Sequence, residues 1–295
     1  MVFDPLDHPI IYTLPERLTA DSAWIRHIPF AYLAIDLLRP QTFVELGTYS
    51  GVSYSAFCHA VQILKLPTRC TAIDTWAGDS HVGKLGPQVL AEFRAFHDAR
   101  FSGFSRLVQA DFDSARATFD DGAIELLHID GAHSYDAVRH DFESYLPKLS
   151  PSGVVLLHDS ADRSQGFGVY RLVEELRRRF PCFEFPHASG LAVIQVGNSP
   201  RAEFTNFLAA AAQRPLAYQS LFARLGEFLQ AAMIGREMTR LQFEQVQAAN
   251  RILAQCGLPI DPKSASLAIA MASPLEFAAF AQKQAASIFG MIKVK

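Results

Sequence analysis

The sequence predicts an α/β fold built on a doubly wound, mostly parallel sheet. Between residues 41 and 197, short apolar runs alternate with amphipathic segments, as strands alternate with crossover helices in such sheets. The run VVLL at 154–157 is continuously apolar, which indicates a central strand covered on both faces. After about residue 198 the strand pattern stops, so we expect an α-helical extension from there.

The predicted elements follow one another in regular order. A helix over about 21–40 would begin at Asp21 or Ser22, both favourable N-cap residues, and would stop at Pro40. Six strands are expected at 42–46, 70–74, 105–110, 124–130, 153–159 and 191–197. Helical spacing of apolar residues predicts crossover helices over 50–64, 88–100, 134–146 and 165–180.

This pattern divides the chain into three parts. Residues 1–40 are a helical lead-in, 41–198 the main α/β domain, and 199–295 the helical extension. In the extension, the spacing of Leu221, Leu225 and Phe228 predicts an amphipathic helix, whose apolar face needs a partner. That partner is the main domain, a second copy of the chain, or a module of a longer protein, so we expect oligomerisation or partner docking here.

Composition excludes several classes of protein. A formal net charge of −3 provides no basic field for nucleic acid, and a small molecule or glycan fits better as the ligand. Four cysteines are scattered without the spacing of a zinc site, which is typical of reduced thiols in a cytoplasm. No apolar run approaches the roughly 20 residues that span a bilayer. A cytoplasmic protein without a membrane span is therefore expected.

The stretch FVELGTYSGVSYSAF predicts a ligand-binding turn between a strand and a helix. Gly47 and Gly51 follow Glu45 there, and glycine permits unusual backbone angles and close approach of a ligand. Alone the signal is weak, because a glycine turn that serves only packing is equally common. Tyr49 also stands where the GxGxxG pattern of a pyrophosphate site requires glycine, which argues against a dinucleotide.

Acidic residues end successive predicted strands. Asp74 follows the second strand, where a carboxylate can accept hydrogen bonds from ribose hydroxyls. Asp111 follows the third, placed to meet an adenine amino group, with Phe112 to pack on the ring. Each acid alone is more often a loop or cap residue. Together they indicate a ligand at the carboxyl edge of the sheet.

The motifs VELGTYSGVS, AIDTW, QADF, LLHIDGAHSYDAVRHDFE and GVVLLHDS occur in an order that resembles class I S-adenosylmethionine-dependent methyltransferases. More narrowly, the chain looks like the branch of sugar O-methyltransferases associated with glycosyltransferases in bacterial polysaccharide clusters. The resemblance implies a Rossmann-like seven-stranded sheet with a final antiparallel strand. It implies that S-adenosylmethionine is bound by Glu45, Gly47, Thr48, Gly51, Ser53, Asp74, Trp76, Asp111, Phe112 and Asp130.

The same resemblance implies a divalent metal. Asp130 and Asp159 end neighbouring predicted strands, and oxygen ligands of this kind suit Mg²⁺ or Mn²⁺. In the related metal-dependent enzymes the third ligand is an Asn or Asp, whereas this chain has Ser160, a weaker neutral ligand. In the alternative without metal, Asp130 touches the cofactor and Asp159 caps a helix.

His133 is the candidate catalytic base, three residues beyond Asp130, which would organise the site. An imidazole with an ordinary pKa near 6.5 can take the proton of an attacking hydroxyl at neutral pH. The alternative is a histidine that only caps the following helix. His81 is a second catalytic candidate, because the segment from Thr75 to Gly86 is rich in glycine and polar residues and could form a lid; an ordinary surface loop is the alternative.

These predictions favour an S-adenosylmethionine-dependent O-methyltransferase acting on a sugar hydroxyl of a bacterial polysaccharide or glycosylated metabolite. One alternative is a metal-independent small-molecule methyltransferase. Others are a nicotinamide-dependent oxidoreductase and a non-catalytic cofactor-binding scaffold. The predicted partners are a small-molecule or glycan acceptor and, through the extension, a second copy of the chain or a glycosyltransferase.

Overall fold

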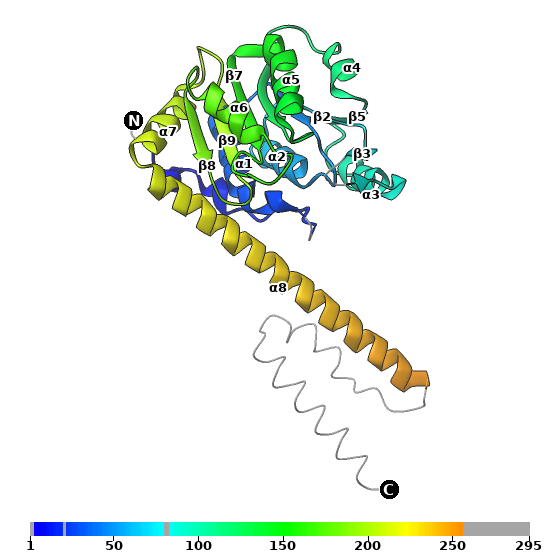
Figure 1. The fold of residues 1–295 in the computed structure, drawn as a ribbon. Helices are drawn as coiled ribbons and strands as arrows, with labels where there is room; N and C mark the ends of the chain where they lie inside the picture. The colour runs from blue at the N-terminus through cyan, green and yellow to red at the C-terminus, as the bar shows by residue number, and fades with distance from the viewer. Residues whose placement is uncertain (1–2, 20–21, 80–82, 256–295) are drawn as a thin grey trace. The chain divides into compact units, whose positions relative to one another are not determined.

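A seven-stranded sheet forms the centre of the fold (Figure 1). The computed structural model describes residues 3–19, 22–79 and 83–255, without the side chains of Asp79 and of residues 236–255. In spatial order the strands are β5 (Ser105–Gln109), β2 (Arg69–Asp74), β1 (Thr42–Leu46), β6 (Ile124–Ile129), β7 (Leu149–His158), β9 (Leu191–Gln195) and β8 (Cys182–Phe185). Strand β9 pairs antiparallel with both β7 and β8, and all other pairs in this sheet are parallel.

The predicted fold class is confirmed: the sheet is mostly parallel and has seven strands, with helices on both faces. All six strands expected from the sequence are present, and β9 is the antiparallel strand that the resemblance implied. The resemblance implied a seventh strand, but the sequence did not locate it: β8 has only four residues, CFEF, and lies between two prolines.

Strand register brings the predicted site residues to one edge of the sheet. Glu45 in β1 is the pairing partner of His128 in β6, and Asp74 in β2 pairs with Gln109 in β5. The chain continues from β1 to β2 and β5 on one side, then crosses back to β6 on the other side of β1. Ligands in sheets of this kind bind where the strand order reverses, beyond the carboxyl ends of the strands.

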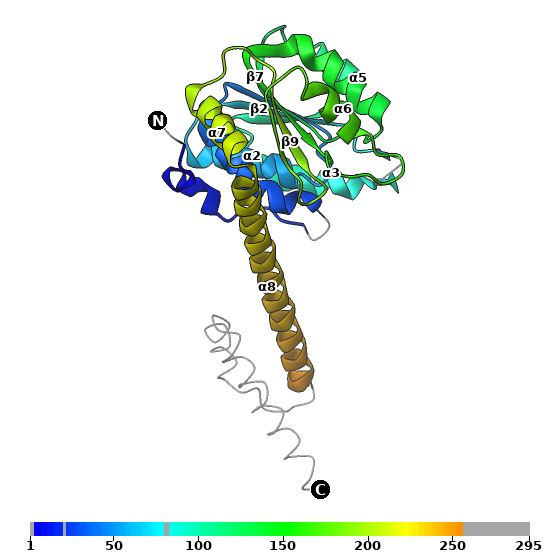
Figure 2. The same cartoon turned by 60° about the vertical axis from the view of Figure 1, so that its left-hand side comes forward.

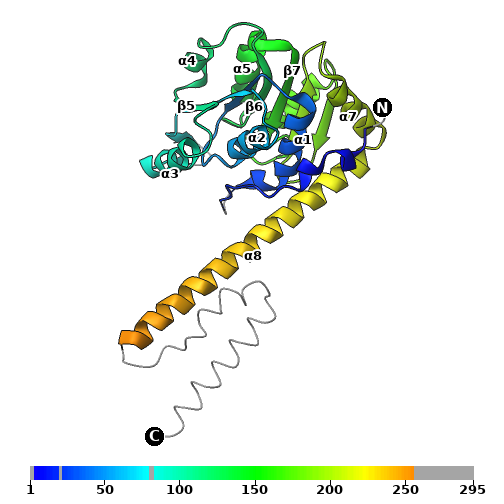
Figure 3. The ribbon, with the colours of Figure 1, turned by 180° about the vertical axis from the view of Figure 1, so that it is seen from behind.

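Helices cover both faces of the sheet, as Figures 2 and 3 show. One face carries α4 (Phe112–Arg116), α5 (Tyr135–Tyr145) and α6 (Val169–Leu176), and the other carries α1 (Ile28–Leu38), α2 (Val52–Ile63) and α7 (Ala202–Gln213). Helix α3 (Pro87–Asp98) lies beside α2. The remaining short elements are η1 (Pro5–Asp7), η2 (Pro9–Tyr12), η3 (Ala23–His27), η4 (Leu146–Lys148), β3 (Gly78–Asp79) and β4 (Gly83–Lys84).

The lead-in segment is helical in two pieces. Ser22 caps η3 by accepting a hydrogen bond from the backbone N–H of Trp24, and η3 runs into α1. Ten of the eleven residues of α1 are buried, so this helix is a core element of the fold. The predicted helix over 21–40 is therefore confirmed from Ser22 onward, with a 3-10 first part; Asp21 lies outside the described residues.

The extension consists of α7 and of α8 (Pro215–Gln255) within the described residues. Contacts divide the chain into two compact units, 1–230 and 231–295, so α7 and the start of α8 belong to the unit that holds the sheet. Phe204, Phe207 and Phe222 are fully buried in that first unit. The division into 1–40, 41–198 and 199–295 stays a prediction. No described helix is both long enough and apolar enough to cross a membrane.

Candidate functional site

A cleft of about 550 Å³ opens at the carboxyl ends of the parallel strands, a size typical of small-molecule sites. Several predicted site residues, which follow five different strands, line it together: Gly47, Thr48, Ser53, Asp74, Asp111, Phe112, Asp130, His133 and Asp159. These residues are up to 112 positions apart in the chain, from Gly47 to Asp159, so the fold alone assembles them.

The cleft is acidic. Five aspartates are among its described lining residues, which include no lysine or arginine. In addition to the four predicted ones, Asp162 contributes a carboxylate. A cleft lined in this way attracts a cationic ligand and repels phosphate groups.

Gly47 is required at the floor of the cleft. Its φ is +83°, in the left-handed region that side chains rarely adopt, and a Cβ there would overlap the backbone carbonyl of Asp130. The strand pairing explains this close approach, because the backbone N–H of Asp130 donates to the carbonyl oxygen of Leu46 at 2.8 Å. Gly51 also has a positive φ, but there the added Cβ would meet the ring of Phe93 instead of the cleft.

Asp74 organises the glycine turn. Its Oδ2 accepts hydrogen bonds from the backbone N–H groups of Thr48 and Tyr49, each at 2.8 Å. Its Oδ1 accepts a third, from the backbone N–H of Trp76 at 2.7 Å. The amides of the turn therefore point at a protein carboxylate, whereas a pyrophosphate site directs such amides to its ligand.

Asp111 lies at the cleft and also caps a helix. Its two carboxylate oxygens accept from the backbone N–H and the hydroxyl of Ser114, at 2.8 and 2.7 Å. These hydrogen bonds lower the pKa of Asp111. Phe112, the next residue, lines the cleft, and the edge of its ring would clash with any Cβ at Gly131.

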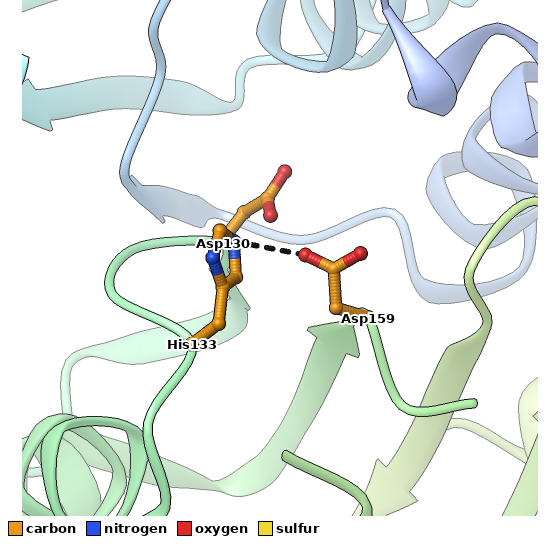
Figure 4. Close-up of side chains that lie close together, drawn as sticks. All are labelled: Asp130, His133 and Asp159. Atoms are coloured by element: carbon orange, nitrogen blue, oxygen red, sulfur yellow. Dashed lines mark ion pairs between the residues drawn. The ribbon is translucent and has the colours of Figure 1, made fainter. Parts of the chain in front are cut away.

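His133 and Asp159 meet at the centre of the site (Figure 4). His133 Nε2 lies 2.9 Å from Asp159 Oδ2, and the His133 ring stacks on Phe167 with ring centroids 4.7 Å apart. Asp159 has a φ of +58° at the end of β7, and Asp is one of the few residues that tolerate this region. This backbone turn directs the Asp159 carboxylate toward the loop that follows β6.

A buried histidine bridges the two predicted metal ligands. His158 Nδ1 lies 3.1 Å from Asp130 Oδ1 and 3.4 Å from Asp159 Oδ2. Burial lowers the pKa of His158, but the two carboxylates outweigh burial and raise that pKa to about 10. Burial likewise opposes ionisation of Asp159, and hydrogen bonds from His133 and His158 nevertheless hold the pKa of Asp159 below its usual range. The site thus contains a cation of its own between two carboxylates.

These residues fit a divalent ion only in part. Asp130, His133 and Asp159 each offer a ligand atom, and the three atoms lie within 4.8 Å of one another. The predicted third ligand, Ser160, is 1% exposed and does not line the cleft. The His158 imidazolium already neutralises part of the carboxylate charge and would repel Mg²⁺, which also prefers oxygen ligands. The donor set therefore does not suit Mg²⁺.

Several other predicted residues lie off the cleft. Trp76 does not line it, because its Nε1 donates to the Tyr49 carbonyl oxygen at 2.9 Å and the indole is buried beneath the turn. The role in binding S-adenosylmethionine that the resemblance implied for Trp76 therefore has no support in this geometry. Glu45 is fully buried below the cleft and bonded to His128. His81 lies outside the described residues.

Sequence reasoning missed part of the lining. Trp24, Asp162, Phe167 and Ser189 line the cleft and come from segments before and after the motifs. His158, which bridges both carboxylates, was also not identified from the sequence. The sequence feature that could have identified His158 is its position directly before Asp159, at the end of the same strand.

Residues 44–160 match the family model described as "Methyltransferase domain". This part of the chain is therefore similar to a methyltransferase domain. The matched residues include the glycine turn, Asp74, Asp111, Asp130, His133 and Asp159 of the cleft. The match thus coincides with the strands whose carboxyl ends build the site.

A relative from Sinorhizobium fredii, named "Uncharacterized protein y4gI", is 43% identical over 180 residues. This alignment covers 61% of the present chain and 20% of the relative, so the chain spans about a fifth of the length of that protein. The shared region supports a common domain and carries no inference about the activity of the longer protein.

Solved structures are similar at a lower level. A methyltransferase from Geobacter sulfurreducens is 19% identical with a TM-score of 0.45. The alignment covers 59% of the present chain and 80% of the Geobacter protein. The O-methyltransferase TomG from Streptomyces achromogenes, in complex with SAM, is 16% identical with a TM-score of 0.45. The alignment covers 62% of the present chain and 83% of TomG. Likenesses at this level carry no inference about the chemistry of this chain.

Proposed function

We propose that the methyltransferase domain uses S-adenosylmethionine and methylates a hydroxyl group. The observation that carries this proposal is the acidic cleft at the strand ends, with five aspartates and no lysine or arginine among its described lining residues. S-adenosylmethionine carries a sulfonium and an ammonium group and no phosphate. Its charge therefore complements the cleft.

The glycine turn supports this cofactor over a nicotinamide dinucleotide. A dinucleotide needs amide N–H groups for its pyrophosphate, but the N–H groups of Thr48 and Tyr49 donate to Asp74. In our proposal the turn lies under the methionine part, Asp74 holds the ribose, and Asp111 and Phe112 hold the adenine. Thr48 and Ser53 line the part of the cleft next to the turn.

His133 is the proposed general base. Asp159 Oδ2 lies 2.9 Å from His133 Nε2 and orients the imidazole. When bound, S-adenosylmethionine supplies a methyl group that the acceptor oxygen takes. His133 receives the hydroxyl proton in that step, and Asp159 stabilises the imidazolium that results.

The proposed reaction runs without a divalent metal. His158 supplies the positive charge that keeps Asp130 and Asp159 close together, and the acceptor is activated by His133 alone. The metal site at Asp130, Asp159 and Ser160 remains a prediction from the resemblance. Measuring turnover in the presence of a chelator distinguishes the metal-independent reaction from the metal-dependent one.

A sugar hydroxyl is the proposed acceptor, following the resemblance to sugar O-methyltransferases. The acceptor side of the cleft supports it chemically, because Trp24 and Phe167 offer apolar ring surface and Asp162 and Ser189 offer hydrogen-bonding groups. This mixture suits a sugar, which has apolar C–H faces and hydroxyl edges. We further propose that the protein works in the cytoplasm and assembles with a second copy, or with a glycosyltransferase, through residues beyond 230.

Calorimetry with S-adenosylmethionine and S-adenosylhomocysteine in the presence of a chelator tests this function directly. We expect 1:1 binding of both ligands, and no binding of a nicotinamide dinucleotide. Binding of the dinucleotide alone would identify an oxidoreductase. Absence of binding by all of these ligands to the folded protein would leave the scaffold alternative.

A further inference from the structure

An arginine of the lead-in segment is bonded to the glycine turn from outside the cleft. Arg17 Nε donates to the carbonyl oxygen of Ser50 at 2.7 Å, across 33 residues of sequence. Two residues further on, Thr19 Oγ1 lies 3.3 Å from Ser50 Oγ. Ser50 lines the cleft, whereas Arg17 does not. The lead-in segment thus holds part of the cleft wall from behind.

Two aromatic rings of α3 hold the guanidinium of Arg17. Its central carbon lies 5.4 Å from the ring centroid of Phe93 and 5.2 Å from that of Phe96. Aromatic rings attract such a cation, and stacking on them restricts the rotamers of a long side chain. Phe93 is fully buried, and its ring also lies against Gly51, where an added Cβ would overlap it. Arg17 is therefore preorganised to donate to Ser50.

The glycine turn needs such bonds because its backbone has more freedom than that of an ordinary turn. Gly51 has a φ of +78°, and glycine adopts positive and negative φ about equally readily. Asp74 fixes the first part of the turn through two backbone N–H groups. Arg17 fixes the last part, because it holds the oxygen of the peptide that joins Ser50 to Gly51. Without Arg17 this peptide can rotate and displace Ser50 in the cleft wall.

We propose that Arg17 is a positioning residue for the cofactor: from outside the cleft it holds the part of the glycine turn that binds the amino acid end of S-adenosylmethionine. The inference rests on the proposed function, which places that end over the turn. Because Arg17 does not line the cleft, it acts through the conformation of Ser50. A turn that is already ordered before binding costs less affinity than one that must be ordered by the ligand.

Two ligands that share an adenosine and a thioether test this proposal by calorimetry. S-adenosylhomocysteine has the amino acid end, whereas 5′-methylthioadenosine lacks it. For Arg17→Ala we expect about tenfold weaker binding of S-adenosylhomocysteine, with binding of 5′-methylthioadenosine unchanged within about twofold. Arg17→Met removes the donor and keeps the apolar part of the side chain. It should give the same selective loss even if Arg17→Ala fails to fold.

Added guanidinium distinguishes positioning of the turn from a general structural role. The space that Arg17→Ala leaves lies beside two aromatic rings and faces the Ser50 carbonyl, so a guanidinium ion can stack and donate there. Millimolar guanidinium chloride should restore the binding of S-adenosylhomocysteine to Arg17→Ala and leave the wild type unchanged. Sodium chloride at the same concentration should restore nothing.

Arg100 provides the matched control. Its guanidinium carbon lies 4.2 Å from the ring centroid of the same Phe96, and its Nε donates to Glu16 of the lead-in segment at 2.8 Å. Among the described residues, Arg100 makes no hydrogen bond to the glycine turn. Arg100→Ala should therefore leave the ratio of the two affinities within about twofold of the wild-type ratio.

The outcomes separate the inference from the proposed function. Equal losses for both ligands, an equal selective loss in Arg100→Ala, no loss in either Arg17 variant, or a loss that guanidinium does not restore would overturn the role of Arg17 while the function stands. A folded wild-type protein that binds neither ligand would overturn the proposed function and this inference with it.

Discussion

His133 Nε2 lies 2.9 Å from Asp159 Oδ2, so the candidate base and a strand-end carboxylate form a hydrogen-bonded pair. Asp159 also lies 3.4 Å from His158 Nδ1. One carboxylate therefore orients a histidine at the cleft and stabilises a buried imidazolium behind it. The pair explains why Asp159 is placed at this strand end without requiring that it bind a metal.

Replacing His133 should affect chemistry more than binding. We expect His133→Ala to lower kcat by about a hundred- to ten-thousand-fold, with little change in affinity for S-adenosylhomocysteine, because the lost interaction belongs to the transition state. Single-turnover methyl transfer and calorimetry measure the two effects. His140→Ala is the matched control, since His140 is an exposed histidine on the adjacent helix and bonds to Asp113. Near-normal turnover in a folded His133→Ala protein would remove His133 as the base.

A chelator should leave turnover intact. The His158 imidazolium, whose pKa is raised to about 10, already pairs with both Asp130 and Asp159 and neutralises part of their charge. The initial rate should therefore be the same within about twofold with EDTA and with added Mg²⁺ or Mn²⁺, allowing for ordinary salt effects. Loss of activity in EDTA that Mg²⁺ restores would instead establish the metal site predicted from the resemblance.

The sheet and the strand-end acids could be predicted because each depends on local sequence. Apolar runs identify strands such as 154–157, and the carboxyl ends of parallel strands meet at one edge, which brings Asp74 and Asp130 together. The exact role of each acid is set by neighbours that are distant in sequence. Asp74, for example, bonds to backbone groups 25 and 26 residues away.

Residues that act through long-range contacts could not be found in this way. The contact between Trp24 and His128 joins residues 104 positions apart, and no periodic pattern encodes it. The resemblance implied that Trp76 lies at the ligand, but its indole N–H bonds to the Tyr49 carbonyl oxygen and the residue does not line the cleft. A buried N–H needs a partner, and this requirement decides the orientation of both tryptophans.

Removing the carboxylate of Asp74 should weaken cofactor binding. Asp74→Ala loses the proposed ribose contact and also releases the N–H groups of Thr48 and Tyr49. We expect the dissociation constant for S-adenosylhomocysteine to rise about ten- to a hundredfold, since a hydrogen bond to a charged group contributes about 1.5–3 kcal/mol. Asp162→Ala, on the proposed acceptor side of the cleft, should leave this constant within about twofold. Unchanged affinity in Asp74→Ala would refute the ribose assignment.

Removing the tail should reduce assembly without unfolding the domain. A cut near Asn198 would delete the buried residues Phe204 and Phe207, so the informative truncation ends at Gln230, where the first compact unit ends. We expect the full chain to be a dimer or larger by light scattering and the 1–230 chain to be a monomer. A chain that ends at Gln255 tests whether α8 is sufficient. The same number of subunits in all three proteins would contradict the proposed role of the tail.

The last prediction concerns Asp141, a carboxyl in α5 that is only 7% exposed. Burial raises the pKa of Asp141 to about 7, with the nearby His140 opposing and Asp113 adding to the rise. An aspartate in an unfolded chain titrates near 4, so the folded state binds this proton more tightly. The free energy of unfolding should consequently fall as the pH rises from about 4 to about 7, and ionised Asp141 should cost roughly 2–4 kcal/mol above that range.

Asp141→Asn should remove this cost. Near pH 4, where Asp141 is neutral in the folded protein and about half ionised in the unfolded chain, the variant and the wild type should have similar free energies of unfolding in urea. At pH 8 the variant should be the more stable protein, because its amide has no charge to bury. Asp136→Asn, an exposed acid in the same helix, controls for the general loss of one negative charge. If the difference between Asp141→Asn and wild type is the same at pH 4 and pH 8, the Asp141 carboxyl does not titrate in this range, and burial does not hold it protonated at neutral pH.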